Sequence, residues 1–523
     1  MFYQSTRGGG QMLTSAEAIV KGLSDDGGLY APVSFPMLAE TDIAGLAPKP
    51  YKDRAAHIIG LFLDDFSAEE LERYASGAYS AAGFDHPSIA PLHMLDSNTY
   101  FLELWHGPTC AFKDMALQML PRLLPASLQK TGESRDACIL VATSGDTGKA
   151  ALEGFSGVPG TKIMVFYPKD GVSEVQELQM TSQDGANVNV TAVEGNFDVT
   201  QTGVKTIFSD DMMRRELSGR GYFLSSANSI NWGRLVPQIA YYFSAYCDLI
   251  AAGGIKPGDR INFCVPTGNF GNILAAYYAE KIGLPVNKLI CASNRNDVLA
   301  QFISTGVYDM NRPFHTTISP SMDILISSNL ERLLFELSGK DGNAVAGYMS
   351  ALSGSGRYEI TPAVRDEVGR IFGGGVCSED DTMETLADMF DKHGYLIDTH
   401  TAVGYKVLED YRAGSGDRTV SVVVSTASPF KFCDSVIGAL SRRRTFSGMA
   451  EPGVLAAASG ALRRADAGDD AEGPGAMRLV DLLSEITGRK VPAPLAGLRN
   501  KRPRFTGSVM PDCMKTAVLE FLS

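Results

Sequence analysis

The sequence predicts an α/β protein in which largely parallel strands are covered by helices. From residue 137 onward, short β-rich apolar runs alternate with longer amphipathic runs, the order that parallel strands with helical crossovers require. The composition allows a large buried core, because 44% of the 523 residues are hydrophobic and 20% are charged. A prior of roughly 150 residues per domain suggests about three units, and we expect two or three domains.

The first 95 residues differ from the rest and predict a small helical unit. Amphipathic stretches at 15–21, 51–62 and 67–82 favour helices. Ser67 followed by Glu70 forms the pattern of a capping box at the start of the third stretch. We therefore expect residues 1–95 to form an N-terminal unit.

The alternation that follows predicts six strands and six helices. Strands are expected over 137–143, 162–167, 188–193, 260–265, 289–292 and 419–425. Helices are expected over 148–155, 175–182, 199–216, 232–252, 272–282 and 297–303. Residues 463–475 are small and charged, with few large apolar side chains, so an exposed, mobile loop is expected there.

The charge balance and the cysteines restrict the class of protein. With 47 Lys+Arg against 60 Asp+Glu the net charge is −13, which argues against binding to nucleic acid or to an anionic membrane. The eight cysteines include no C-x-x-C pair and the histidines no i, i+4 pair, so neither a metal site nor a disulfide framework is expected. Cysteines in apolar runs indicate a reducing compartment. We expect a cytoplasmic protein with no signal peptide, no transmembrane helix and no visible protein partner.

Two strand-to-helix turns could bind anions. In Val265-Pro-Thr-Gly-Asn-Phe-Gly-Asn272, the glycines allow a phosphate to approach backbone N–H groups at a helix start. The turn Ala142-Thr-Ser-Gly-Asp-Thr-Gly148 is rich in hydroxyls and suits a carboxylate or a phosphate. Taken singly, each turn is better explained as a simple connector than as a binding site. Neither matches a P-loop or a G-x-G-x-x-G dinucleotide fingerprint.

Lys113 is the candidate nucleophile or base. It follows the apolar pair Ala111 and Phe112, where partial desolvation would lower its pKa and favour Schiff-base chemistry. The alternative is a lysine whose amine reaches solvent from a helix start. One such lysine together with two anion turns fits a pyridoxal-phosphate enzyme, whereas a nucleotide enzyme would also need a metal-binding acidic pair.

At these positions the sequence resembles the threonine synthase family of fold-type II pyridoxal-phosphate enzymes, and more closely its longer-chain branch. The resemblance runs almost end to end. The matching motifs are Tyr3-Gln-Ser-Thr-Arg-Gly8, Gly22-Leu-Ser-Asp-Asp-Gly-Gly-Leu-Tyr-Ala-Pro32, His106-Gly-Pro-Thr-Cys-Ala-Phe-Lys-Asp114, Thr143-Ser-Gly-Asp-Thr-Gly148, Ala227-Asn-Ser-Ile-Asn-Trp-Gly-Arg234, Pro266-Thr-Gly-Asn-Phe-Gly-Asn272, Ser319-Pro-Ser-Met-Asp-Ile324, Ser328-Asn-Leu-Glu-Arg332 and His400-Thr-Ala-Val-Gly404.

The resemblance implies an architecture of two open, twisted, mostly parallel sheets with flanking helices, preceded by the N-terminal unit. Residues 96–134 and 222–523 would form a large cofactor-binding domain. Residues 135–221 would form a small mobile α/β domain, whose closure would exclude water from the reacting carbanion.

The resemblance also implies a reaction, in which O-phospho-L-homoserine and water become L-threonine and phosphate. Lys113 would hold pyridoxal 5'-phosphate as a Schiff base and move protons at Cα and Cβ. The cofactor phosphate would lie on Gly268, Asn269, Phe270, Gly271 and Asn272, and Thr426 would face the pyridine nitrogen. The substrate carboxylate would meet Ser144, Gly145, Asp146 and Thr147, and its phosphate Asn228, Ser229 and Arg234.

Four positions depart from the family pattern. Ser428 and Phe430 stand where the family often has histidine and alanine, Thr399 stands where proline is common, and Lys149, expected to be solvated, stands where a small residue is common. Two alternative functions stay open: a related phospholyase that releases 2-oxobutyrate and ammonia, and a non-catalytic homologue. A serine or threonine dehydratase is disfavoured, because Arg234 with its neighbours suits a phosphorylated substrate.

Overall fold

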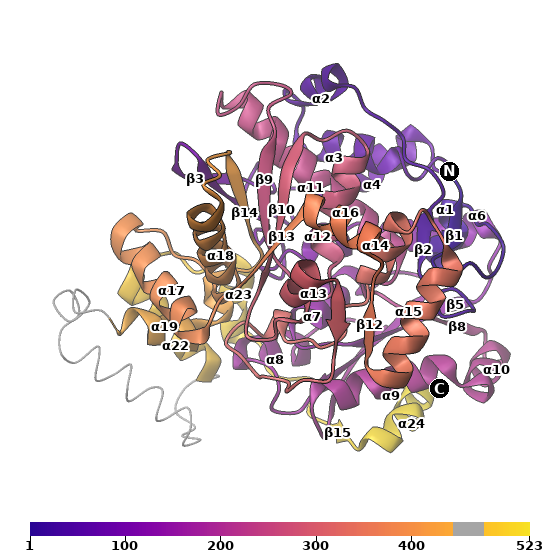
Figure 1. Cartoon of the computed structure of the whole chain (residues 1–523). Coiled ribbons are helices and arrows are strands. Elements are labelled where there is room, and N and C mark those ends of the chain that lie inside the picture. Colours follow the sequence, from indigo (N-terminus) through magenta and orange to yellow (C-terminus); the bar gives the residue numbers. More distant parts are fainter. Residues whose placement is uncertain (443–474) are drawn as a thin grey trace.

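Two separate parallel sheets form the framework of the protein (Figure 1). The computed structural model describes residues 1–442 and 475–523, so the expected loop at 463–475 lies, except for Gly475, outside the described residues. The larger sheet has the order β13 (Phe372–Val376), β10 (Val286–Ser293), β9 (Ile261–Pro266), β14 (Ser421–Ser425), β4 (Thr99–Glu103) and β3 (Leu92–Asp96). Its strands are parallel except for the β3–β4 pair.

The smaller sheet is parallel throughout. Its order is β15 (Ser508–Val509), β7 (Val188–Val193), β6 (Thr161–Pro168), β5 (Asp136–Ala142) and β8 (Tyr222–Ser225). Two short antiparallel pairs complete the strands: β1 (Tyr3–Ser5) with β2 (Tyr30–Pro32), and β11 (Val307–Asp309) with β12 (Arg357–Glu359).

The described residues also form α-helices on and around the sheets. They are α1 (Ser15–Lys21), α2 (Glu40–Leu46), α3 (Tyr51–Gly60), α4 (Ala68–Ala78), α5 (Asp114–Leu117), α6 (Leu120–Thr131), α7 (Asp146–Phe155), α8 (Glu174–Thr181), α9 (Phe197–Ser209), α10 (Asp211–Gly219), α11 (Trp232–Ala251), α12 (Gly271–Lys281), α13 (Val298–Thr305), α14 (Leu330–Leu337), α15 (Gly342–Ser355), α16 (Pro362–Ile371), α17 (Glu379–His393), α18 (Thr399–Ser415), α19 (Cys433–Leu440), α22 (Gly475–Thr487), α23 (Ala493–Ala496) and α24 (Met514–Phe521). None of these is long and apolar enough to cross a membrane.

The expected strands and helices are largely confirmed. The six expected strands correspond to β5, β6, β7, β9, β10 and β14, and the capping box at Ser67 starts α4. The single helix expected over 199–216 is wrong. It is two helices, because the Asp210 carboxylate accepts hydrogen bonds from the N–H groups of Met212 and Met213 and so starts α10.

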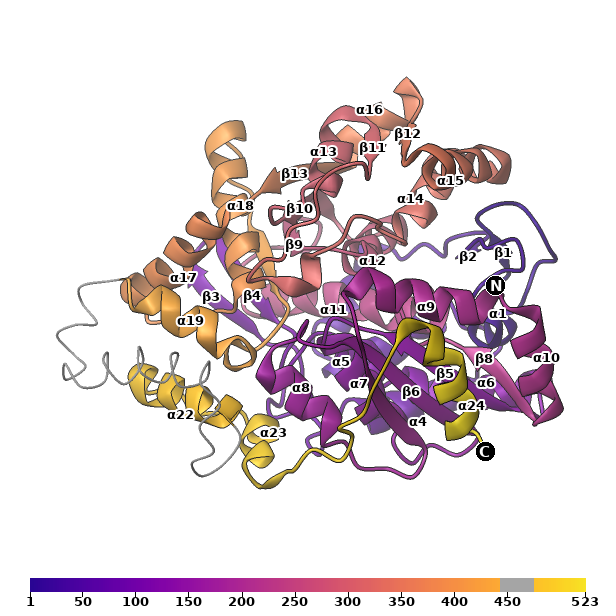
Figure 2. The ribbon, with the colours of Figure 1, turned by 90° about the horizontal axis from the view of Figure 1, so that it is seen from below.

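The smaller sheet takes strands from outside the range 135–221. That range supplies β5, β6 and β7, while β8 follows it directly and β15 comes from the C-terminal end of the chain. Figure 2 shows the last segment running from α23 along the small sheet to α24. There Met514, Val518 and Leu522 share a buried cluster with Val204 and Ile207 of α9.

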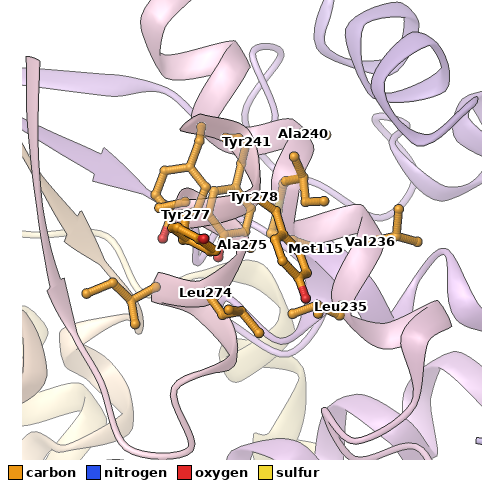
Figure 3. Packing of buried hydrophobic residues seen from close by; sticks show 14 of the residues in the cluster. Met115, Leu235, Val236, Ala240, Tyr241, Leu274, Ala275, Tyr277 and Tyr278 are labelled. Atoms are coloured by element: carbon orange, nitrogen blue, oxygen red, sulfur yellow. The ribbon is translucent and has the colours of Figure 1, made fainter. Parts of the chain in front are cut away.

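The segment that carries Lys113 is fixed by the largest hydrophobic cluster. Met115 lies two residues after Lys113 and packs with α11 and α12, where Tyr241 and Tyr278 are also fully buried (Figure 3). A residue in such close-packed surroundings has little freedom to shift. The backbone at Lys113 is therefore held rigidly by the core.

Close packing of α5 against α7 places Lys113 beside the turn at 143–148. A Cβ atom on Gly154 of α7 would lie 2.1 Å from the carbonyl oxygen of Leu117, the last residue of α5. Glycine at this position therefore lets the two helices approach closely.

Gly154→Ala should lower the free energy of unfolding by about 1–3 kcal/mol, because the added methyl forces α7 away from α5. Gly369→Ala in α16 is the matched control. No atom lies within 4 Å of its added Cβ, so the free energy of unfolding should rise, by up to about 1 kcal/mol. Urea denaturation would measure both, and equal effects of the two variants would contradict the packing argument.

Candidate functional site

A cavity of about 1080 Å³ lies where strands of both sheets end. Its lining includes Ala142 at the end of β5, Pro266 at the end of β9 and Thr426 after β14. This is the edge at which open parallel sheets bind ligands. The predicted site residues that line it are Lys113, Ser144, Asp146, Thr147, Asn228, Ser229, Arg234, Gly268, Asn269, Gly271, Asn272 and Thr426. Gly145 and Phe270 are not among the lining residues.

The Lys113 amine is buried beside a carboxylate. Its Nζ donates to Asp146 Oδ2 at 3.0 Å and to Ser321 Oγ at 3.2 Å. Burial lowers the pKa of Lys113, against the opposing effect of the Asp146 charge. The expected desolvation is confirmed, and the alternative of an amine that reaches solvent is wrong, because only 7% of the residue is exposed.

The Asp146 carboxylate accepts from four side chains. Its Oδ2 accepts from Lys113 Nζ at 3.0 Å and from Ser321 Oγ at 3.4 Å, and its Oδ1 accepts from Lys431 Nζ and from Gln176 Nε2, both at 2.7 Å. Burial alone would raise the pKa of this carboxyl, but the two lysines hold it well below its usual range. The side chain is therefore an anion, which makes it a poor ligand for another carboxylate.

Sequence reasoning missed Lys431 as a site residue. Its amine is fully buried and also donates to the Thr109 carbonyl at 3.0 Å. The available signal was its position between Phe430 and Phe432, the same kind of apolar surrounding that singled out Lys113. The structure thus adds a second buried lysine to the site.

The glycine loop has the geometry of a phosphate cradle. Phe270 has φ +61, in the left-handed region, and α12 begins at the next residue. The carbonyl of Gly268 accepts from Ser327 Oγ at 2.9 Å, and that of Asn269 from the Asn329 N–H at 3.1 Å. Because peptides are planar and trans, the N–H groups of the same peptide units point to the opposite side of the loop. A helix start with such N–H groups fits a phosphate.

Two glycines of this loop could not carry side chains without a shift. A Cβ on Gly268 would lie 2.8 Å from the Ser321 carbonyl oxygen, and one on Gly271 would lie 3.2 Å from the Cβ of Ser229. The Asn272 side chain stabilises the turn instead of facing a ligand, because it donates to the Pro266 carbonyl at 2.9 Å and accepts from Thr267. Its backbone remains available for a phosphate.

Arg234 and Asn228 carry polar atoms that lack partners. Arg234 is buried in α11 and donates through Nη1 to the Ala227 carbonyl at 2.6 Å. Within the described residues, its Nε and the Oδ1 of Asn228 have no hydrogen-bond partner. Burial lowers the pKa of Arg234 to about 10, so the guanidinium stays charged at neutral pH. A buried cation with an unused donor is suited to bind an anion.

His400 supports Lys113 indirectly and was not predicted as a site residue. Its Nδ1 lies 2.8 Å from Asp398 Oδ1, and its Nε2 accepts from the Ser321 N–H at 3.1 Å. The second bond requires a lone pair on Nε2, so the proton lies on Nδ1. His400 thereby fixes Ser321, whose hydroxyl contacts the Lys113 amine.

The departures from the family pattern are accommodated locally. Ser428 donates its N–H to the Cys110 carbonyl at 3.0 Å, and Phe430 is buried in a hydrophobic cluster. Thr399 is buried at the start of α18. The expectation that Lys149 is solvated is wrong, because α7 packs this side chain against the segment at 183, where it contacts Gln183 and pairs with Glu153 at 2.8 Å.

Comparison with known proteins identifies the fold and the cofactor. The family model for the threonine synthase N terminus matches residues 2–79, that for pyridoxal-phosphate dependent enzymes matches 86–426, and that for the threonine synthase C-terminal region matches 401–465. Within the described residues no cluster of three or more metal-ligand side chains is found.

Similar proteins cover most of the chain. Threonine synthase of Pseudomonas aeruginosa is 41% identical over 83% of this chain and 90% of its own, and that of Saccharomyces cerevisiae is 35% identical over 85% and 90%. The structure of pyridoxal-phosphate-bound threonine synthase from Brucella melitensis covers 100% of this chain with 99% of its own, at 37% identity and a TM-score of 0.83. The yeast threonine synthase structure gives 30% identity over 100% and 98%, again with a TM-score of 0.83.

The matches agree with the site described above, in which a buried lysine and a phosphate cradle share one cavity. The resemblance seen in the sequence motifs is confirmed. The chain belongs to the threonine synthase family and is a pyridoxal-phosphate-dependent lyase.

Proposed function

We propose that this enzyme converts O-phospho-L-homoserine and water to L-threonine and phosphate, the last step of threonine biosynthesis. The observation that carries the proposal is the pairing of two anion-binding segments in one cavity with Lys113. The glycine loop suits the phosphate of the cofactor. Arg234, whose Nε has no partner among the described residues, suits the phosphate of the substrate together with Asn228.

The cofactor would be held at three places. Lys113 would bond to it covalently, the N–H groups of the loop 268–272 would bind its phosphate, and Thr426 would face its ring nitrogen. Phe112 donates its N–H to the Thr426 carbonyl at 2.8 Å, so the lysine segment and the end of β14 keep a fixed spacing. When bound, pyridoxal phosphate supplies an electron sink for the carbanion at the substrate Cα.

The other residues would orient the substrate and move its protons. The hydroxyls of Ser144 and Thr147 with the start of α7 would hold the carboxylate, and Arg234 the phosphate. The Lys113 amine would take protons from Cα and Cβ, after which phosphate leaves Cγ. Water adds its hydroxyl at Cβ, and protons return to Cα and Cγ, the latter becoming the methyl group of threonine.

We also propose a division into an N-terminal unit 1–95, a large domain 96–134 and 222–523, and a small mobile domain 135–221, except that β8 and β15 belong to the small domain. The pairing of β8 with β5 and of β15 with β7 supports adding these two strands to the small domain.

A reducing compartment such as the cytoplasm is supported by the eight free cysteines, of which seven are buried.

Product counting tests the reaction directly. The purified enzyme loaded with pyridoxal phosphate should form threonine and phosphate in equal amounts from O-phospho-L-homoserine. Lys113→Ala should lack the yellow chromophore and lose at least about 10³-fold in turnover. Phosphate matched by 2-oxobutyrate would identify the phospholyase instead, and a coloured protein without turnover would point to a non-catalytic homologue or another substrate.

Arg234→Gln should raise the KM for O-phospho-L-homoserine by about 10–100-fold, because it removes a charge-assisted contact to the phosphate. Cofactor binding should stay unchanged. Homoserine, which lacks the phosphate, is the control ligand, and its weak binding should be the same in both proteins. A loss of homoserine binding of the same size would contradict the phosphate role.

Asp146→Asn distinguishes a charge partner of Lys113 from a substrate ligand. Removing the carboxylate leaves two buried lysines without a counterion, so the free energy of unfolding should fall by about 3–5 kcal/mol. We expect kcat to drop at least about tenfold with little change in KM. A raised KM at unchanged kcat would show instead that Asp146 binds the substrate.

A further inference from the structure

Arg332 is a fully buried cation in the first turn of α14. Its Nε donates to the Tyr30 carbonyl at 2.8 Å, Nη1 to the Ser229 carbonyl at 3.1 Å and to Asn329 Oδ1 at 2.5 Å, and Nη2 to the Ile230 carbonyl at 2.6 Å. All of these acceptors are neutral. Among the described residues no carboxylate pairs with it, and the adjacent Glu331 pairs with Arg7 instead.

Such a charge is costly to bury. A buried guanidinium without a counterion loses its hydration, and neutral acceptors compensate for this loss only in part. Burial lowers the pKa of Arg332 to about 10, which still leaves it charged at neutral pH. The arrangement is understandable if an anion binds nearby.

Three of the four acceptors of Arg332 belong to the substrate-phosphate segment and to its own loop, and the fourth is Tyr30 in β2. Ser229 and Ile230 follow Asn228, a cavity residue whose Oδ1 has no partner among the described residues. Asn329 extends the link to the cofactor loop, because its Nδ2 donates to Ser229 Oγ at 2.8 Å and to the Asn269 carbonyl at 3.0 Å. One arginine therefore connects both phosphate-binding segments.

The junction of the two segments is tightly packed. A Cβ on Gly271 would lie 3.2 Å from Ser229 Cβ and 3.3 Å from Asn329 Nδ2. A displacement of Ser229 or Asn329 would therefore displace the cofactor loop as well. Arg332 is not among the residues that line the cavity, so it acts on ligands only through these neighbours and through its charge.

We propose that Arg332 is a positioning residue which, through Asn329, holds the cofactor-phosphate loop against the substrate-phosphate segment and supplies both with a positive field. The inference rests on the proposed function, in which the loop 268–272 binds the cofactor phosphate. It predicts that substitution of Arg332 weakens the binding of ligands that carry a phosphate, but not the binding of the same ligands without the phosphate.

The test compares pyridoxal phosphate with pyridoxal on cofactor-free enzyme, by absorbance titration without substrate. Arg332→Lys keeps the charge but cannot reach all four acceptors. It should weaken the binding of pyridoxal phosphate at least about tenfold while pyridoxal binding stays within about twofold. The KM for O-phospho-L-homoserine should rise as well. Arg332→Met, which also removes the charge, should show a larger loss of pyridoxal phosphate affinity.

Arg54→Lys is the matched control. Arg54 is also buried and donates to the carbonyls of Leu46, Ala47 and Ser244, but it pairs with Asp248, and neither residue of this pair lines the cavity. It should lower the melting temperature without changing the preference for pyridoxal phosphate over pyridoxal. A change in this preference of the same size as in Arg332→Lys would overturn the proposal.

A second variant keeps the proposal testable if Arg332→Lys does not fold. Asn329→Ala should cause the same selective loss of pyridoxal phosphate affinity, and in the double variant the two effects should not add. Equal loss for both ligands, or no loss, would overturn the inference.

Gly271→Ala tests the cofactor loop itself. If this variant keeps its preference for pyridoxal phosphate over pyridoxal, the assignment of the loop as the phosphate cradle fails, whatever the Arg332 variants do.

Discussion

The burial of the Lys113 amine beside the Asp146 carboxylate is the interaction on which the site depends. An amine at this depth must be paired, and the pairing fixes the start of α7 against α5. Lys431, from a segment distant in the sequence, binds the other oxygen of the same carboxylate. The close contact at Gly154 and the packing around Met115 serve this arrangement, because they keep α5 and α7 at the distance that the ion pair requires.

Two buried cations beside the cavity have no carboxylate partner among the described residues. Asp146 pairs with Lys113 and Lys431, whereas Arg234 and Arg332, both buried, donate only to neutral groups. In a low-dielectric interior a cation without a counterion favours ligands that carry negative charge. Two phosphates and one carboxylate are the groups that the proposed reaction brings into this cavity. The two arginines therefore agree with the proposed substrate.

The C-terminal segment links the two sheets of the molecule. After α23 the chain leaves the cluster around α19 and α22, pairs as β15 with β7, and packs α24 on α9. Since α9 supplies part of the cavity wall through Phe197, Val204 and Phe208, the last residues of the chain support the wall from behind. A motion of the small domain would have to carry this segment with it.

The sequence by itself determined the elements whose signals are local. The alternating apolar runs predicted six strands at their correct positions. The motifs around Lys113, 143–148 and 268–272 identified the cavity walls, because a glycine turn after a strand is encoded within a few residues. Only the tertiary structure decided the partners of these residues. The ionic state of Asp146, the contact of His400 with Ser321, the burial of Lys149 and the four acceptors of Arg332 all involve groups far apart in the chain or buried by distant elements. Because burial and pairing arise from contacts between segments that are distant in the sequence, no local pattern encodes them.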